Sequence, residues 1–259
     1  MSAPEILVHP NSGLLAAGVA ARLITRLVDA QARRGTASVV LTGGGAGLAA
    51  LAAVADSPAR DAVDWGRLDV WWGDERFLPS GHPERNETGA REALLDRVPV
   101  DPARVHVMRG PDGPDGDDAD AAAARYAAEL AAAAQGAPSA VPAFDVLMLG
   151  VGPDAHIASL FPGQPTLREE KLTAVGVHGS PKPPPTRISL TVPAIRAAEE
   201  VWVIASGSSK AEAVRLGLAD ADVMEAPVAA ARGLRSTLYL LDRDAASALP
   251  PGSSPVSSG

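Results

Sequence analysis

The chain has 259 residues, 46% of them hydrophobic, which is enough to bury a large core in one α/β domain. It contains no cysteine, which excludes disulfides, thiolate metal sites and cysteine nucleophiles. A formal charge of -8 argues against a general surface for nucleic acid or anionic membranes, but it is compatible with a small basic pocket for one phosphate.

Neither a targeting segment nor a membrane segment is evident in the sequence. No basic-then-apolar stretch near the N-terminus resembles a signal peptide, and no apolar run approaches the roughly 20 residues that span a bilayer. We therefore expect a cytoplasmic protein that binds neither nucleic acid nor membrane and is a monomer or weak homo-oligomer.

Short apolar runs rich in β-branched residues alternate with helical patterns along the chain. We predict strands at residues 6–8, 38–41, 68–72, 105–107, 144–149, 201–205 and 237–241. We predict helices at residues 14–32, 47–55, 87–97 and 119–134. This alternation is typical of an α/β fold in which a doubly wound, mostly parallel sheet carries helices on both faces. We expect one domain over residues 1–248 and a disordered tail, rich in Pro, Ser and Gly, at 249–259.

A glycine-rich segment follows the second predicted strand and opens a helix. The backbone N–H groups of Gly43, Gly44 and Gly45, with the helix N-terminus, can hold an anion without any cationic side chain. Leu48 stands where the dinucleotide fingerprint needs glycine, and the Lys-Ser/Thr ending of a nucleotide P-loop is absent, so we expect no cofactor. The alternative is that the glycines only allow a tight turn.

A charged turn follows the third predicted strand and places Asp74, Glu75 and Arg76 at the same edge of the sheet. Arg76 is the functional candidate, because its planar guanidinium suits a carbonyl oxygen or oxyanion. We expect Glu75 to be structural, pairing with Arg76 to hold the loop.

The apolar run at 144–149 ends in glycines that deliver Asp154 and His156 into a turn. Ligands of parallel sheets bind just beyond the carboxyl ends of the strands, and an imidazole there can act as a general base. The alternative is that Asp154 caps the next turn and His156 pairs with a carbonyl.

Three further cations are candidates for binding a phosphate. Lys182 and Arg187 lie on either side of a stiff Pro-rich segment that resembles a rigid lip over a pocket. Lys210 begins a helix, where a lysine is unfavourable unless an anion binds. All three could also face solvent. No pair of His or carboxylate side chains has the spacing of a metal site, so we expect metal-free acid–base chemistry.

Four separated segments together resemble the family of glucosamine-6-phosphate isomerases and 6-phosphogluconolactonases. They are Thr42-Gly-Gly-Gly45, Trp72-Gly-Asp-Glu-Arg-Phe77 with Asn86 following, Gly150-Val-Gly-Pro-Asp-Ala-His-Ile-Ala-Ser-Leu-Phe-Pro162, and Ser180-Pro-Lys-Pro-Pro with Arg187-Ile-Ser-Leu-Thr191. The resemblance runs to about residue 245. It implies a Rossmann-like fold and hydrolysis of 6-phospho-D-glucono-1,5-lactone to 6-phosphogluconate in the oxidative pentose phosphate pathway.

Two positions depart from the pattern of that family. Ala155 stands where the family usually has glycine, so a backbone that needs positive φ would be strained there. The stretch Gly45-Ala-Gly47 lacks the hydroxyl or Arg, followed by Thr-Pro, that the phosphate loop commonly carries. This change leaves the phosphate to backbone amides and distant cations.

For lactone hydrolysis we predict three catalytic residues. His156 would act as general base on water, Asp154 would orient the imidazole or stabilise its cation, and Arg76 would stabilise charge on the lactone oxygen. The residues predicted to bind the sugar or its phosphate are Gly43, Gly44, Gly45, Asp74, Lys182, Arg187 and Lys210.

The sequence leaves two other functions open. A sugar-phosphate isomerase or deaminase shares the fold and would use Asp74 to take a proton from carbon. The Arg after Asp74-Glu75, the Ser159-Leu-Phe-Pro162 ending and the Pro-rich lip favour the lactonase. A non-catalytic sugar-phosphate sensor would be expected to carry a DNA-binding module, and this acidic chain shows none.

Overall fold

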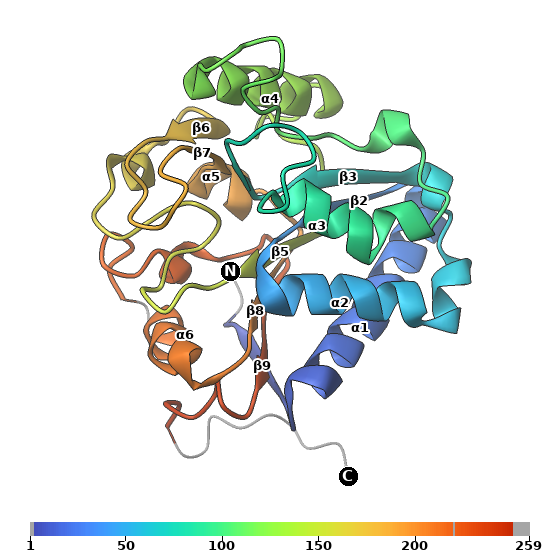
Figure 1. The fold of residues 1–259 in the computed structure, drawn as a ribbon. Helices are drawn as coiled ribbons and strands as arrows, with labels where there is room; N and C mark the ends of the chain where they lie inside the picture. Colours follow the sequence, from blue (N-terminus) through green and yellow to red (C-terminus); the bar gives the residue numbers. More distant parts are fainter. Residues whose placement is uncertain (1–2, 220, 251–259) are drawn as a thin grey trace.

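The protein is described by a computed structural model that covers residues 3–219 and 221–250 (Figure 1). Its centre is a six-stranded parallel sheet in the order β1-β9-β8-β5-β2-β3. The strands are β1 (Glu5–His9), β2 (Ala37–Leu41), β3 (Leu68–Trp72), β5 (Val146–Gly150), β8 (Glu200–Ala205) and β9 (Ser236–Asp242). Most of the predicted tail lies outside the described residues, and its disorder and the single domain over 1–248 stay predictions.

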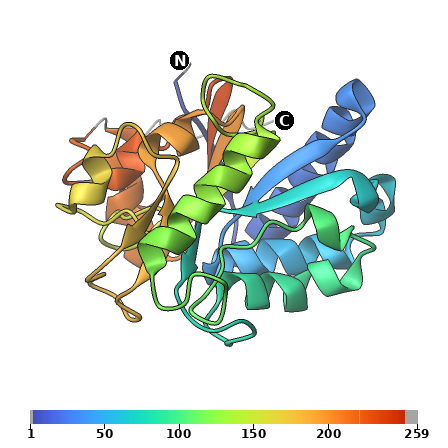
Figure 2. The same ribbon diagram turned by 90° about the horizontal axis from the view of Figure 1, so that it is seen from above.

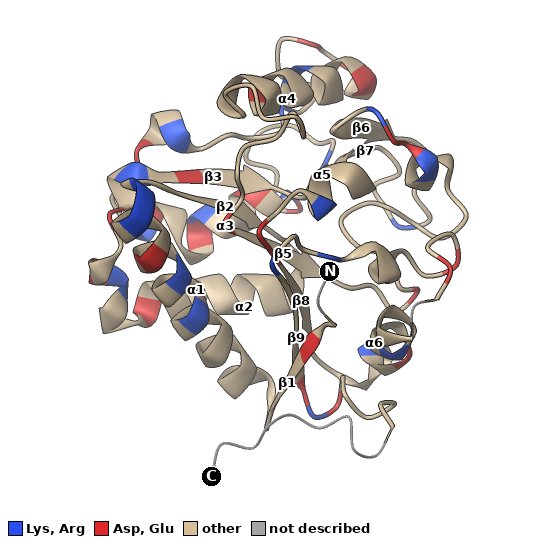
Figure 3. Cartoon of the chain, turned by 180° about the vertical axis from the view of Figure 1, so that it is seen from behind, with Lys and Arg blue, Asp and Glu red and all other residues tan. Residues whose placement is uncertain are grey.

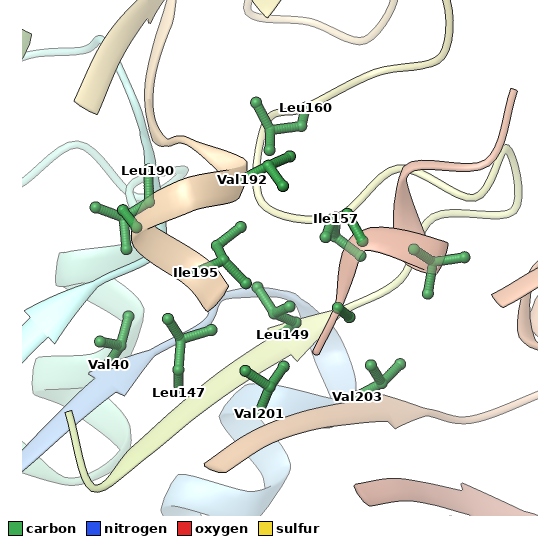
Figure 4. Close-up of a cluster of buried hydrophobic side chains, with 14 of the residues drawn as sticks. Val40, Leu147, Leu149, Ile157, Leu160, Leu190, Val192, Ile195, Val201 and Val203 are labelled. Atoms are coloured by element: carbon green, nitrogen blue, oxygen red, sulfur yellow. The ribbon is translucent and has the colours of Figure 1, made fainter. Parts of the chain in front are cut away.

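Alternate residues of the same strands enter two separate cores, one on each face of the sheet. Val39 and Val146 pack into one core, whereas their neighbours Val40 and Leu147 pack into the other (Figure 4). A strand that is buried on both faces needs apolar residues at nearly every position, which explains the unbroken apolar runs in the sequence.

Helices cover both faces of this sheet, and the predicted α/β arrangement is confirmed. One face carries α1 (Ser12–Arg34), α2 (Gly44–Asp56) and α3 (Asn86–Ala93). The other face carries α4 (Ala119–Ala133), α5 (Val192–Arg196) and α6 (Ala211–Leu218). In Figure 2, seen from above, the blue-to-teal helices lie on one side of the strands and the orange-to-red helices on the other, with the light-green α4 in front.

The longest helix, α1, forms because its apolar residues recur at helical spacing between two clear end signals. Leu15, Val19 and Leu23 belong to its buried stripe. The Asn11 side chain accepts the N–H of Leu14 at 2.9 Å and caps the start, and Gly35 ends the helix with a left-handed φ of 78°.

A second, three-stranded antiparallel sheet was not predicted. It contains β4 (Asp74–Arg76), β7 (Arg187–Leu190) and β6 (Ala174–Val177), in the order β4-β7-β6. Strand β4 follows β3 after a single glycine and leaves the main sheet to pair with β7, so that Arg76 lies opposite Arg187. This sheet therefore brings the charged turn to the Pro-rich lip.

Two predicted elements differ from the structure. Residues 105–107 form no strand and only one isolated bridge, between Val105 and Val70, because the chain touches the edge of β3 and then turns away. The helix predicted at 87–97 ends at Ala93, and a separate 3-10 turn covers Leu95–Arg97.

Charged residues of both signs are interspersed along α1 and the elements beside it (Figure 3). In the described part of the chain, no helix combines the length and the apolar character that a bilayer crossing requires.

Candidate active site

A cavity of about 180 Å³ opens at the carboxyl edge of the main sheet, where the ends of β2 and β5 meet β4 and the lip. Eight of the predicted site residues line it: Gly43, Gly44, Asp74, Arg76, His156, Lys182, Arg187 and Lys210. Gly45 lines a neighbouring cavity of about 440 Å³ that shares Gly44 and Lys210 with the first. Of the predicted residues, only Asp154 borders neither cavity, and it contacts His156 directly.

His156 and Asp154 form a hydrogen-bonded pair in the loop after β5. The distance from His156 Nδ1 to Asp154 Oδ1 is 2.6 Å. With an ionised Asp154 as acceptor, the proton of a neutral imidazole sits on Nδ1, which leaves Nε2 as the basic nitrogen. The Phe161 ring packs against the imidazole with its centroid 4.5 Å away. The alternative fates of capping a turn and pairing with a carbonyl are wrong for these two residues.

Electrostatics favour an ionised Asp154 beside a neutral His156. Partial burial opposes ionisation of Asp154, but hydrogen bonds from Lys182 and His156 outweigh it and lower the pKa of the carboxyl to about 2. Burial lowers the pKa of His156 below its usual value despite the opposing Asp154 carboxylate, and the charge of Lys182 adds to this lowering. These are the protonation states that a general base near neutral pH requires.

The loop that carries the pair is tightly folded. Ala155 has a φ of 66°, so the strain expected at this position is confirmed; a left-handed backbone costs roughly 1–2 kcal/mol for a residue other than glycine. Gly152 is needed for a different reason, since a Cβ there would lie 2.0 Å from His156 Nδ1 and 2.3 Å from Asp154 Oδ1. The Gly152 N–H also donates to the His156 carbonyl at 2.9 Å and closes the loop.

The glycine-rich turn leads from β2 into the N-terminus of α2. Gly43 precedes the helix, and Gly44 has a left-handed φ of 78°. A Cβ on Gly43 would lie 1.9 Å from Asn86 Oδ1, so glycine is required there for close approach as well as for any anion. The first turn of α2 contains no acidic residue, which leaves its N–H groups and positive dipole end for a ligand.

In the charged turn on β4, the side chains of Asp74 and Arg76 line the cavity, whereas Glu75 lies in the protein interior. Asp74 is buried, and its carboxylate accepts the Ser159 hydroxyl at 2.7 Å and the Asn86 amide at 3.2 Å. The guanidinium of Arg76 donates to the Glu84 carbonyl. Arg76 Nε is buried and has no hydrogen-bond partner among the described residues, while the side chain lines the cavity.

Glu75 holds the loop as expected, but through partners other than the guanidinium of Arg76. Its carboxylate accepts the backbone N–H groups of Arg76, Asn86 and Glu87 at 2.8, 2.7 and 2.8 Å and lies 3.7 Å from Arg85. Burial raises the pKa of Glu75 to about 7, although Arg85 and these N–H groups act against it. The predicted pairing with Arg76 is therefore wrong in its partner, because a buried carboxylate at the start of α3 satisfies the free N–H groups of that helix.

The three further cations all line the cavity, but they differ in their hydrogen-bond partners. Lys182 contacts the Asp154 carboxylate at 2.9 Å, and Arg187 donates to carbonyls of the lip. The side-chain ammonium of Lys210 has no hydrogen bond or ion pair with any residue of the ranges 3–219 and 221–250. Burial and then the charge of Lys182 lower the pKa of Lys210. Of the three, Lys210 is thus the cation whose partly buried charge a bound anion would stabilise most.

Three residues that shape the site carried no functional prediction. Asn86 bridges the glycine turn to Asp74, Ser159 binds Asp74, and Thr42 accepts the N–H of Gly150 at 3.1 Å. All three lie within the segments that carry the family resemblance, but their partners are remote in sequence and no local pattern identifies them.

The fold and the site define an α/β protein that pairs an acid–base couple with an anion-binding turn at the edge of a parallel sheet. The chain belongs to the family of glucosamine-6-phosphate isomerases and 6-phosphogluconolactonases, whose sequence profile matches residues 10–239.

Curated relatives and solved structures agree with this membership. The chain is 62% identical over 248 residues to the 6-phosphogluconolactonase of Streptomyces coelicolor, covering 95% of each chain. It is 46% identical to that of Mycobacterium tuberculosis, covering 95% of this chain and 98% of the relative. The 6-phosphogluconolactonase structure from Trypanosoma brucei superposes with a TM-score of 0.79 at 29% identity, covering 95% and 99% of the two chains. A monomeric glucosamine-6-phosphate deaminase at 19% identity, with a TM-score of 0.76 and coverage of 94% and 99%, shares the fold.

Proposed function

We propose that this protein is a cytoplasmic carboxylic ester hydrolase that converts 6-phospho-D-glucono-1,5-lactone to 6-phospho-D-gluconate in the oxidative pentose phosphate pathway. The observation that carries the proposal is the hydrogen bond of 2.6 Å between His156 and Asp154 in a cavity beside the glycine turn. The names of the relatives that cover nearly the whole chain supply the substrate.

His156 is the general base of the proposed reaction. Its Nε2 takes a proton from water as the water oxygen bonds to the lactone carbonyl carbon, while Asp154 stabilises the imidazolium that forms. When the tetrahedral intermediate collapses, the bond from that carbon to the ring oxygen breaks and the imidazolium returns the proton to the departing oxygen. The products balance, because one water and one lactone give one open-chain hydroxy acid.

Other residues hold the two ends of the substrate. Arg76 stabilises the negative charge on the carbonyl oxygen in the intermediate, a role that suits a guanidinium lining the cavity. The phosphate lies against the N–H groups of Gly43, Gly44 and Gly45 and the ammonium of Lys210. The residues assigned to shaping the sugar subsite are Asp74, Lys182 and Arg187, whose hydrogen bonds go to other protein groups.

The test is turnover of freshly made lactone, with the spontaneous rate subtracted. We expect His156→Ala to lower kcat by about 10² to 10⁴ while KM changes little, because general-base help has that size and the base does not anchor the phosphate. His178→Ala, at an exposed position, is the matched control. Normal turnover by His156→Ala would remove the imidazole from the mechanism.

The isomerase or deaminase alternative is tested in the same assay with glucosamine 6-phosphate. Asp74 would be its base, but both oxygens of that carboxylate already accept hydrogen bonds from Ser159 and Asn86. We expect no turnover of the amino sugar, and turnover of neither compound would favour a sugar-phosphate sensor.

A further inference from the structure

Lys182 directs its ammonium at the catalytic pair. Its Nζ lies 2.9 Å from Asp154 Oδ1 and 3.1 Å from His156 Nδ1. The same carboxylate oxygen also contacts His156 Nδ1 at 2.6 Å. One oxygen thus receives two donors, an arrangement that an ionised carboxylate favours.

A buried arginine fixes the segment that carries Lys182. Arg187, at the start of β7, donates to the carbonyls of Lys182, Pro183 and Pro184 at 3.1, 3.0 and 3.1 Å. The Ser180 hydroxyl donates to the Lys182 carbonyl at 2.9 Å and accepts its N–H at 3.2 Å. The backbone of the lip is therefore held by the protein itself, and the direction of the lysine side chain does not depend on a ligand.

Arg187 also lies over the aromatic ring that packs against the imidazole. Its guanidinium carbon lies 5.6 Å from the centre of the Phe161 ring, and that ring contacts His156. A single buried cation thus supports both the lip and the aromatic wall of the base.

The charged groups around His156 act in opposite directions. Asp154 from its own loop and Asp74 from β4 favour the imidazolium, whereas burial and the Lys182 ammonium disfavour it. The other cations that line the cavity are Arg76, Arg187 and Lys210. Lys182 is the cation in direct contact with the imidazole, so its charge opposes the protonating influence of Asp154 most closely.

We propose that Lys182 is a positioning residue that completes a Lys–Asp–His cluster, locking Asp154 against His156 and keeping the imidazole neutral and ready to accept a proton. This inference rests on the proposed lactonase function and deepens it. It also gives Lys182, which the sequence suggested as a ligand of the sugar or its phosphate, a role toward the catalytic pair, and leaves the phosphate to the glycine turn and Lys210.

The direction in which the pKa of His156 changes follows from the positive charge of Lys182. In Lys182→Met the cation that disfavours the imidazolium is gone, so the pKa of His156 rises. The acid limb of the kcat/KM profile, which reports the base of the free enzyme, should move to higher pH by about one unit, the usual scale of such perturbations. Activity falls most on the acidic side of the profile and least on its alkaline plateau.

The experiment compares purified full-length variants by pH–rate profile and by NMR titration of the His156 ring. The chain contains three lysines, which provide matched controls: exposed Lys171→Met removes an equal charge away from the site, and Lys210→Met removes the proposed phosphate cation. We expect the shift in Lys182→Met, its reversal in Lys182→Arg, no change in Lys171→Met, and a raised KM with only a small shift in Lys210→Met.

Two results decide the matter. If Lys182→Met raises KM and leaves the acid limb and the His156 titration at their wild-type positions, Lys182 is a substrate ligand and the proposal is wrong. Lys182→Gln repeats the test if the methionine variant does not fold, as judged by circular dichroism. The NMR titration needs no substrate, so it tests the cluster even if the wild-type protein fails to hydrolyse the lactone, which would instead refute the proposed function.

Discussion

At the scale of single residues, the loop after β5 shows why glycine and alanine are not interchangeable around the catalytic pair. Gly152 has no left-handed φ, but a methyl group there would overlap His156 and Asp154. Ala155 has the left-handed φ of 66° that favours glycine, yet its side chain is buried in the core. Position 152 thus excludes any side chain although its φ is not left-handed, whereas position 155 holds a buried side chain although its φ is left-handed.

This contrast gives a paired prediction. Gly152→Ala should lower kcat by about 10²-fold, because the methyl group displaces the imidazole from its carboxylate and a misplacement of about 1 Å has that effect. Ala155→Gly should keep kcat within about twofold, since relief of roughly 1–2 kcal/mol of backbone strain offsets the lost methyl contact and the added chain entropy. Steady-state kinetics and thermal unfolding of both variants check this, and equal activity in the two would contradict the loop geometry.

At the scale of elements, the small sheet and α3 are joined by one buried carboxylate. Glu75 lies on β4 and accepts two N–H groups from the first turn of α3, so it fixes the start of that helix beside the cavity. Asn86, the first residue of the helix, then reaches both Asp74 and the glycine turn.

The raised pKa of Glu75 predicts how stability depends on pH. The pKa is about 7 in the folded protein against 4.5 for the free group, so the unfolded chain loses this proton first. The contribution of Glu75 is complete below about pH 4.5 and is lost as pH rises through 7, a change of roughly 3 kcal/mol. We expect the difference in free energy of unfolding between wild type and Glu75→Gln to shrink by this order across that range. Glu92→Gln, an exposed change on the same helix, should show no such trend in urea titrations.

Long apolar runs allowed most elements of the main sheet to be predicted from the sequence. The run at 68–72 coincides with β3 because all of its residues except Asp69 are buried in one of the two cores. Strands β4, β6 and β7 were missed because three or four residues, several of them polar, give no periodic signal; their pairing depends on partners far along the chain.

The same limit applies to the site. Asp154 and His156 were predicted because a strand end and a turn deliver them together, which is local information. The contact of Lys182 with Asp154 spans 28 residues and depends on how Arg187 folds the lip, so the sequence suggested a cation near the site but not its partner.

At the scale of the whole molecule, the cavity lies where two sheets meet, and each contributes part of it. The base and the glycine turn follow strands of the main sheet, whereas Asp74, Arg76 and Arg187 belong to the small sheet. The reaction therefore needs both sheets in place, although the main sheet holds most of the buried strand residues.

Because the site needs both sheets, we predict that activity and global structure are lost at different urea concentrations. The four tryptophans lie beside or within β3 and in β8, so their fluorescence reports the main sheet. We expect activity to disappear at a lower urea concentration than the fluorescence changes, because short strands open before a central parallel sheet does. Coincident transitions would show that the two sheets unfold as one unit.

The second cavity, which shares Gly44 and Lys210 with the first, matters for inhibitor chemistry. Its volume is about 440 Å³, and Leu15, Ala16 and Ile204 supply apolar walls. A lactone mimic that carries a small hydrocarbon group near its phosphate end would place that group there, gaining about 25 cal/mol for each Å² of apolar surface removed from water. The apolar walls of this cavity thus offer an inhibitor hydrophobic contacts that a phosphate group cannot make.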